Sequence, residues 1–239
     1  MLTLGVDGCP GGWLAASARW PSGCAGGGPA SLSWAVHPDL TCLLASPPAR
    51  EAGLIVIDVP IGLSDGPPRP CDREARLRLG PRRASVFAPP MRAMLAMPDR
   101  EAAGAYGQGV RPGGGVSAQS WNILPKIKEA DAAMTRGLQA RVREGHPEVA
   151  FARLAGAPMP QAKKTRAGRA ARLRTLADAG LDASGPLAGL TARRPRPAAP
   201  DDLIDACVLA VTARDALAGT AWVLGGARDA RGLRMEILG

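Results

Sequence analysis

Aromatic residues are scarce in this chain and make up only 3% of its 239 residues. This scarcity argues against a protein that holds single-stranded nucleic acid by stacking bases on aromatic side chains. Long apolar runs are also missing, since no window approaches the ~18 uninterrupted apolar residues that a membrane helix needs. The first residues, MLTLGVDG, lack the charged and then apolar layout of a signal peptide. We therefore expect a cytoplasmic protein that does not enter a membrane.

Paired cysteines and nucleotide-binding signatures are missing as well. The five cysteines are odd in number, widely scattered and never spaced as C-x-x-C: Cys9, Cys24, Cys42, Cys71 and Cys207. This pattern predicts reduced thiols and favours neither a disulfide framework nor a zinc site. No internal repeat, Walker A motif or G-x-G-x-x-G motif is visible. At this length, with 46% apolar residues, one domain over residues 1–239 is expected.

Positive charge is abundant, with 30 Lys and Arg against 21 Asp and Glu and a net charge of +9. Such a charge favours contact with polyanions and opposes free acidic partners. Only four of the 30 basic residues are Lys, however, and a biased genome composition produces the same excess of Arg together with abundant Ala, Gly and Pro. A nucleic-acid footprint and a composition effect both remain open.

Alternating or continuous apolar residues predict the strands of one sheet. The predicted strands are residues 2–7, 13–20, 32–37, 54–59 and 141–144, with a weaker final pair at 221–224 and 233–238. Turn-forming residues 8–12 join the first two strands into a hairpin. The glycines of this turn also resemble a phosphate-cradling loop, but a plain hairpin turn explains them better.

Helical spacing predicts an α/β arrangement in which helices flank the sheet. The predicted helices are residues 39–45, 117–134 with a kink at Pro125, 148–154, 163–180, and one that follows a Pro/Arg linker at 191–200 and is capped by Asp201. Residues 60–115 have no clean periodicity and are dense in Arg and Pro. We interpret them as an insertion that carries one helix near residues 71–79.

Carboxylates at strand ends are the candidates for chemistry. Asp7 and Asp58 each end a hydrophobic strand and would meet if the two strands are neighbours. Such a pair can hold Mg²⁺, and two-metal phosphodiester cleavage needs a third or fourth carboxylate. Asp202 and Asp205 lie three apart on one face of the last helix. Asp205 is the better candidate, because Asp201 and Asp202 sit in the first turn, where capping explains them. For Asp7 and Asp58 the alternative is a structural role, in which each binds the N–H groups of a turn.

The segment EGHPE, residues 144–148, offers two further carboxylates and an imidazole after a strand. Glu144 could complete a metal site, and His146 could shuttle a proton near neutral pH. A lone histidine more often caps or packs, so this alternative stays open for His146.

Seven motifs in order carry a resemblance over nearly the whole chain. They are GVDGCPGGW (5–13), IDVPIGL (57–63), CDREAR (71–76), RRASVFAPP (82–90), SAQSWNILPKIKEAD (117–131), EGHPE (144–148) and DDLIDA (201–206). Together they resemble family 429 among the domains of unknown function. The resemblance implies a ribonuclease H-like fold with a central mixed five-stranded sheet, and a nuclease activity that uses one or two Mg²⁺ or Mn²⁺ ions. It implies that Asp7, Asp58 and Asp205 bind metal and are catalytic, with Glu144 as a less secure fourth residue.

Three functions follow as hypotheses. The first is a metal-dependent nuclease acting on a structured nucleic acid, RNA or DNA, which basic residues would grip: Arg73, Arg76, Arg82, Arg83, Lys163, Lys164, Arg166 and Arg169. The second is a nucleotide-binding phosphotransferase or ATPase of the actin and sugar-kinase type. A single Asp-Gly strand turn argues against it, because those proteins clamp the nucleotide between two such domains. The third is a non-catalytic adaptor that binds nucleic acid or protein through the insertion.

Overall fold

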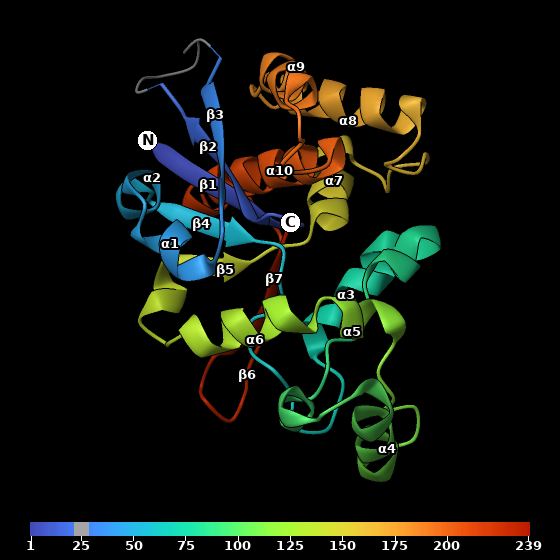
Figure 1. Cartoon of the computed structure of the whole chain (residues 1–239). Helices are drawn as coiled ribbons and strands as arrows, with labels where there is room; N and C mark the ends of the chain where they lie inside the picture. The colour runs from blue at the N-terminus through green and yellow to red at the C-terminus, as the bar shows by residue number, and fades with distance from the viewer. Residues whose placement is uncertain (22–28) are drawn as a thin grey trace.

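The computed structural model describes residues 1–21 and 29–239 and is organised around a five-stranded mixed sheet (Figure 1). The strands are ordered β3-β2-β1-β4-β5. Their bounds are β1 Leu2–Cys9, β2 Gly12–Arg19, β3 Ser31–His37, β4 Leu54–Ile57 and β5 Val142–Glu144. Strands β1, β2 and β3 form an antiparallel meander, whereas β4 and β5 run parallel to β1. The parallel strands therefore end at the same edge of the sheet as β1.

The pleat of the strands divides their side chains between two apolar layers. Leu4 and Val6 of β1 and Ile57 of β4 belong to one core cluster, while Val56 belongs to the other. Because side chains alternate along a strand, the odd-numbered residues of β1 face the layer that Val56 faces. Thr3 confirms this direction, since its hydroxyl donates a hydrogen bond of 2.8 Å to the carbonyl of Ala210.

Helices cover both faces of the sheet. The layer that contains Val56 is formed with α7 Pro147–Ala155, α8 Arg166–Asp178, α9 Ser184–Ala192 and α10 Pro200–Leu217. The opposite layer is formed with α1 Leu40–Ala45, α2 Pro47–Glu51 and α6 Leu124–Ala133. Helix α10 lies directly on β1 at Gly5, where an added Cβ would collide with backbone atoms of Ala206 and Ala210. The glycine thus permits the close approach that sets the position of α10 over the sheet.

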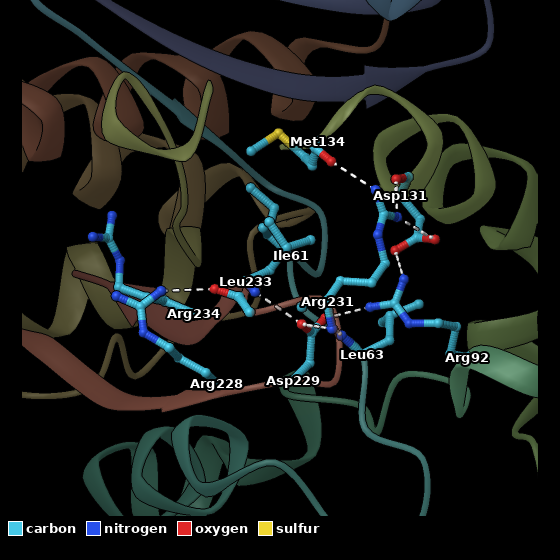
Figure 2. A network of polar contacts seen from close by, with 12 residues as sticks. Ile61, Leu63, Arg92, Asp131, Met134, Arg228, Asp229, Arg231, Leu233 and Arg234 are labelled. Carbon is cyan, nitrogen blue, oxygen red and sulfur yellow. Dashed lines mark hydrogen bonds and ion pairs between the residues drawn. The ribbon is translucent and has the colours of Figure 1, made fainter. Parts of the chain in front are cut away.

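The long connection between β4 and β5 packs beside a second, two-stranded sheet. It contains α3 Pro70–Leu79, α4 Arg100–Val110, α5 Ala118–Asn122 and α6, and the second sheet pairs β6 Val223–Arg228 with β7 Arg234–Leu238. Figure 2 shows how the turn between β6 and β7 is tied down. The buried carboxylate of Asp229 accepts hydrogen bonds from the backbone N–H groups of Leu63 and Leu233 and pairs with Arg92. Arg92 in turn pairs with Asp131 of α6.

The main strands and most helices lie where the sequence predicts them, with several differences. The helix expected at 117–134 is two helices, α5 and α6, because the chain breaks at Ile123 and Pro125 opens the second one. The helix expected from residue 163 begins at Arg166, since Thr165 caps it. Asp201 does not cap α10. Its N-cap is Ala199, whose backbone N–H donates to Asp202.

Helices α2, α4 and α9 were not expected from the sequence. Cys9, Cys42, Cys71 and Cys207 are free thiols, as predicted, and Cys24 lies outside the described residues. In the portion of the chain described, no helix has both the length and the apolar character needed to cross a membrane.

Candidate functional site

Asp7 and Asp58 lie side by side at the edge where the parallel strands end. In the register of β1 and β4, Val6 is paired with Ile57, so the next residue of each strand is an aspartate. The Asp58 N–H donates a hydrogen bond of 2.9 Å to the Val6 carbonyl, which fixes the backbone at this point. By the alternation of the pleat, both carboxylates point to the face of the sheet that α10 covers. Asp7 is buried, and Asp58 is partly exposed.

Helix α10 brings a third carboxylate to the same place. Asp205 precedes Ala206, the residue that touches β1 at Gly5, and its side chain is only 2% exposed. Asp202 lies one turn earlier on the same face, where its Oδ2 accepts the Ala199 N–H at 2.8 Å. The sequence interpretation of Asp202 as a cap is therefore correct, and Asp205 is the residue of α10 that remains available to the site.

Burial and neighbouring charges perturb all three carboxylates. Burial, and then the negative charges of Asp58 and Asp205, raise the pKa of Asp7 well above its ordinary value. Burial raises the pKa of Asp58, against the opposing effects of His146 and Lys163. Burial also raises the pKa of Asp205 to about 7, although Lys163 acts in the opposite direction. Three like charges in a poorly solvated place favour a cation among them.

Lys163 supplies a positive charge inside this group. Its Nζ donates a hydrogen bond of 2.5 Å to Oδ2 of Asp205 and lies 3.9 Å from a carboxylate oxygen of Asp201. Burial alone would lower the pKa of Lys163. The negative charge of Asp205 and the hydrogen bond between the two side chains outweigh this effect, so the pKa of Lys163 lies above its ordinary value. Lys163, which the sequence predicts to contact nucleic acid, pairs with the acidic site within the chain itself.

A cavity of about 350 Å³ opens beside these groups. Asp58, Asp205 and Lys163 line one part of it, and further residues complete its wall: Arg82, Ser85, Phe87, Gln119, His146, Pro147, Glu148, Ala162 and Lys164. Four buried polar atoms of this wall have no hydrogen-bond partner among the described residues, namely Asp205 Oδ1, Glu148 Oε2, His146 Nδ1 and Arg82 Nε. Unsatisfied buried polar groups are costly, and their concentration around one cavity indicates a place for polar ligands.

Glu148, the second carboxylate of EGHPE, is the candidate to which the sequence interpretation gave no role. It lies in the first turn of α7, and its Oε1 accepts a hydrogen bond of 2.5 Å from the buried guanidinium of Arg172. Its Oε2 is 3.5 Å from Arg82 and belongs to the cavity wall. Arg172 is 1% exposed. No helical pattern in the sequence marks Arg172 as buried, so no sequence signal pointed to its pairing with Glu148.

Glu144, which the sequence offered as a fourth catalytic residue, is engaged elsewhere. Its carboxylate accepts hydrogen bonds of 2.8 and 2.6 Å from the buried guanidinium of Arg69, and another of 2.6 Å from the Ile61 N–H. Arg69 also pairs with Asp72 at 2.6 Å. The reason is the register of β5, in which Glu144 is paired with Ile57 and not with Asp58. Its side chain therefore points away from the face that carries the three aspartates.

The remaining basic residues predicted to bind nucleic acid differ in their distance from the cavity and in their exposure. Arg82 and Lys164 reach the cavity. Arg76 is partly buried, and its Nε donates to the Val86 carbonyl at 2.9 Å. The others lie on exposed or half-exposed positions of α3, the 3₁₀ helix Gly80–Ser85 and α8: Arg73, Arg83, Arg166 and Arg169.

The donor chemistry of the site suits a hard divalent cation. Asp7, Asp58 and Asp205 offer carboxylate oxygens, the ligands that Mg²⁺ and Mn²⁺ prefer, and Asp205 Oδ1 is buried without a partner. Within residues 1–21 and 29–239, however, no group of three or more His, Cys, Asp or Glu side chains stands ready to hold a metal. The Lys163 ammonium contacts Asp205 instead.

Comparison with known proteins gives one family. Neither the curated proteins nor the solved structures include a match to this chain. The family described as "Protein of unknown function (DUF429)" matches residues 5–230, a span that includes Asp7, Asp58, Glu148, Lys163 and Asp205. Because this match covers nearly the entire sequence, the chain belongs to the DUF429 family.

Proposed function

We propose that this chain is a ribonuclease H-like nuclease that uses one or two Mg²⁺ or Mn²⁺ ions to hydrolyse phosphodiester bonds of a structured nucleic acid. The observation that carries the proposal is the convergence of Asp7 in β1, Asp58 just after β4 and Asp205 in α10, of which Asp58 and Asp205 line one cavity. The strand order β3-β2-β1-β4-β5, with β4 and β5 parallel to β1, agrees with a ribonuclease H-like sheet.

Asp7, Asp58 and Asp205 would hold the metal. Bound there, a divalent ion would supply an acidified water and would stabilise negative charge on the phosphoryl group. The protein contributes the rigid position of these ligands. Asp7 lies in β1 and Asp58 directly follows the paired strand β4, while the position of Asp205 is set by the close contact of α10 with Gly5.

The wall of the cavity suits a phosphodiester. Arg82 and Lys164 bring positive charge to the mouth of the acidic site, so that the phosphate of a nucleic acid can approach three carboxylates. Ser85 and Gln119 add hydrogen-bonding groups on the same wall. His146 lines the cavity near Asp58, with Nδ1 unpartnered and Nε2 3.2 Å from the Ser85 carbonyl. We assign it the role of moving a proton between the cavity and solvent.

The test is a cleavage assay with matched variants. The purified chain is incubated with Mn²⁺ or Mg²⁺ and with single-stranded, duplex, hybrid and junction substrates of RNA and DNA. Cleavage of at least one substrate is expected, with a loss of at least about a hundredfold in Asp58→Asn because a ligand is removed. Asp65→Asn, an exposed change in the connection that follows β4, is the control and should cut like the wild type. The proposal fails if nothing is cut, or if Asp58→Asn is as active as Asp65→Asn.

A further inference from the structure

Lys163 reaches the acidic site from a segment that lies outside the helices and strands. It lies in the connection between α7 and α8, two residues before the N-cap Thr165, and residues 156–165 contain no helix or strand. Its side chain is 38% exposed, whereas that of its partner Asp205 is 2% exposed. The ammonium thus enters from the solvent side and covers a carboxylate that the fold itself buries.

The contact lies on the same carboxylate that a metal ion would need. Asp205 has two carboxylate oxygens: Oδ2 accepts the Lys163 hydrogen bond at 2.5 Å, and Oδ1 is buried without a partner. An ammonium and a divalent cation cannot both lie against one buried carboxylate without strong repulsion. A divalent cation at Asp205 would therefore have to displace the Lys163 ammonium.

We propose that Lys163 is the built-in counter-ion of the acidic site and competes with a divalent cation for Asp205. Metal binding then releases the Lys163 ammonium into the cavity, beside Lys164 and Arg82. The release needs only rotation of a flexible four-carbon side chain. The consequence of this release rests on the proposed function: after the metal has bound, the freed ammonium meets the phosphate of the nucleic acid.

Lysine signals in NMR spectra report the release directly in the wild-type protein. The chain has only four lysines, Lys126, Lys128, Lys163 and Lys164, so a sample labelled with ¹³C-lysine gives four sets of ε-methylene signals. Lys→Arg variants assign them. Saturation with Mg²⁺ should move the Lys163 signal to the position of a solvent-exposed lysine. Lys128, exposed on α6 at the other face of the sheet, should not move.

Removing the competitor should tighten metal binding. Calorimetric titration with Mn²⁺ at about pH 8.5, where protons compete little for the carboxylates, should give Lys163→Met an affinity about tenfold above the wild type. Lys164→Met is the matched control, because it removes an equal charge from the next residue and from the same cavity. Its affinity should stay within about twofold of the wild type, since long-range charge effects are screened.

The outcomes separate this inference from the proposed function. A Lys163 signal that stays in place while calorimetry shows bound Mg²⁺ overturns it, as does equal Mn²⁺ affinity of the two lysine variants. Absence of metal binding in both the wild type and Lys163→Met also overturns it. Displacement of Lys163 without cleavage of any nucleic acid supports the inference and refutes the nuclease, while cleavage without displacement does the reverse.

Discussion

Asp205→Asn should make the metal-free protein more stable at alkaline pH, in spite of losing an ion pair. In the folded chain the pKa of Asp205 is about 7, against an ordinary value of 3.8, because burial opposes its charge more than Lys163 supports it. The unfolded chain therefore releases this proton at a lower pH than the folded one, and stability falls as pH rises from about 4 to about 7. Above about pH 7 the loss is complete.

The size of the effect follows from the shift. A change from 3.8 to about 7, at 1.36 kcal/mol per unit, corresponds to about 4 kcal/mol of lost stability. Asparagine has nearly the shape of the aspartate and no charge, so Asp205→Asn should avoid most of this cost. At about pH 4, where Asp205 stays protonated in the folded protein, the two proteins should differ little.

Urea unfolding followed by circular dichroism, in a chelating buffer at about pH 4 and about pH 8, measures the difference. The gain of the variant should appear only at the higher pH and should shrink when saturating Mg²⁺ is added to both proteins. Asp178→Asn, at an exposed position of α8, is the control and should show no such gain. A difference between Asp205→Asn and the wild type that is the same at both pH values refutes the reasoning.

Three further predictions concern buried contacts that stabilise the fold around the site. Arg69→Met should lower the free energy of unfolding by about 3–5 kcal/mol in urea titrations, because Glu144 then stays buried without its guanidinium; a loss under about 1 kcal/mol contradicts this. Gly5→Ala should fail to give soluble folded protein, because the added methyl group would collide with α10. Gly8→Ala is the control and should express normally, since the nearest contact of its methyl group would be an ordinary 3.6 Å. Equal yields of the two variants would contradict the close contact at Gly5. Asp229→Asn should lower thermal stability by about 1–3 kcal/mol, since a buried carboxylate that pairs with Arg92 is lost; an unchanged melting temperature counts against this role (Figure 2).

The positions of Asp7 and Asp58 could be predicted because they depend on local pattern. Asp7 lies near the end of the apolar strand β1 and Asp58 directly follows β4, and alternation along each strand fixes the face to which the side chain points. Asp205 could be chosen over Asp202 for a similar reason, since only the first turn of a helix needs caps. These inferences require no knowledge of which residues meet across the fold.

Glu144 and Glu148 show where such reasoning ends. Glu144 ends β5, but in the pairing of β5 with β4 it lies opposite Ile57 and not Asp58, which turns its side chain to the other face. Register between strands that are far apart in sequence depends on packing and cannot be seen in either strand alone. Glu148 is held by Arg172, a partner 24 residues away whose burial no helical pattern revealed.

Helix α4 was missed for a different reason. Three glycines, Gly104, Gly107 and Gly109, lie within it, and glycine disfavours a helix by about 1 kcal/mol relative to alanine. The start signal was nevertheless present, because Asp99 caps the helix by accepting the Ala102 N–H at 2.8 Å. Packing of Gly107 against Gly114, with no room for a Cβ, shows why a small residue is needed there.

Mn²⁺ binding by a set of isosteric variants tests most directly the claim that three aspartates form one metal centre. Calorimetric titrations would compare the wild type with Asp7→Asn, Asp58→Asn, Asp205→Asn and Glu144→Gln, each first shown to be folded by circular dichroism. Binding by the wild type and Glu144→Gln, with a loss of affinity of at least about tenfold in all three aspartate variants, is the predicted result. Undiminished binding in any of the three aspartate variants, or a loss confined to Glu144→Gln, would contradict the account.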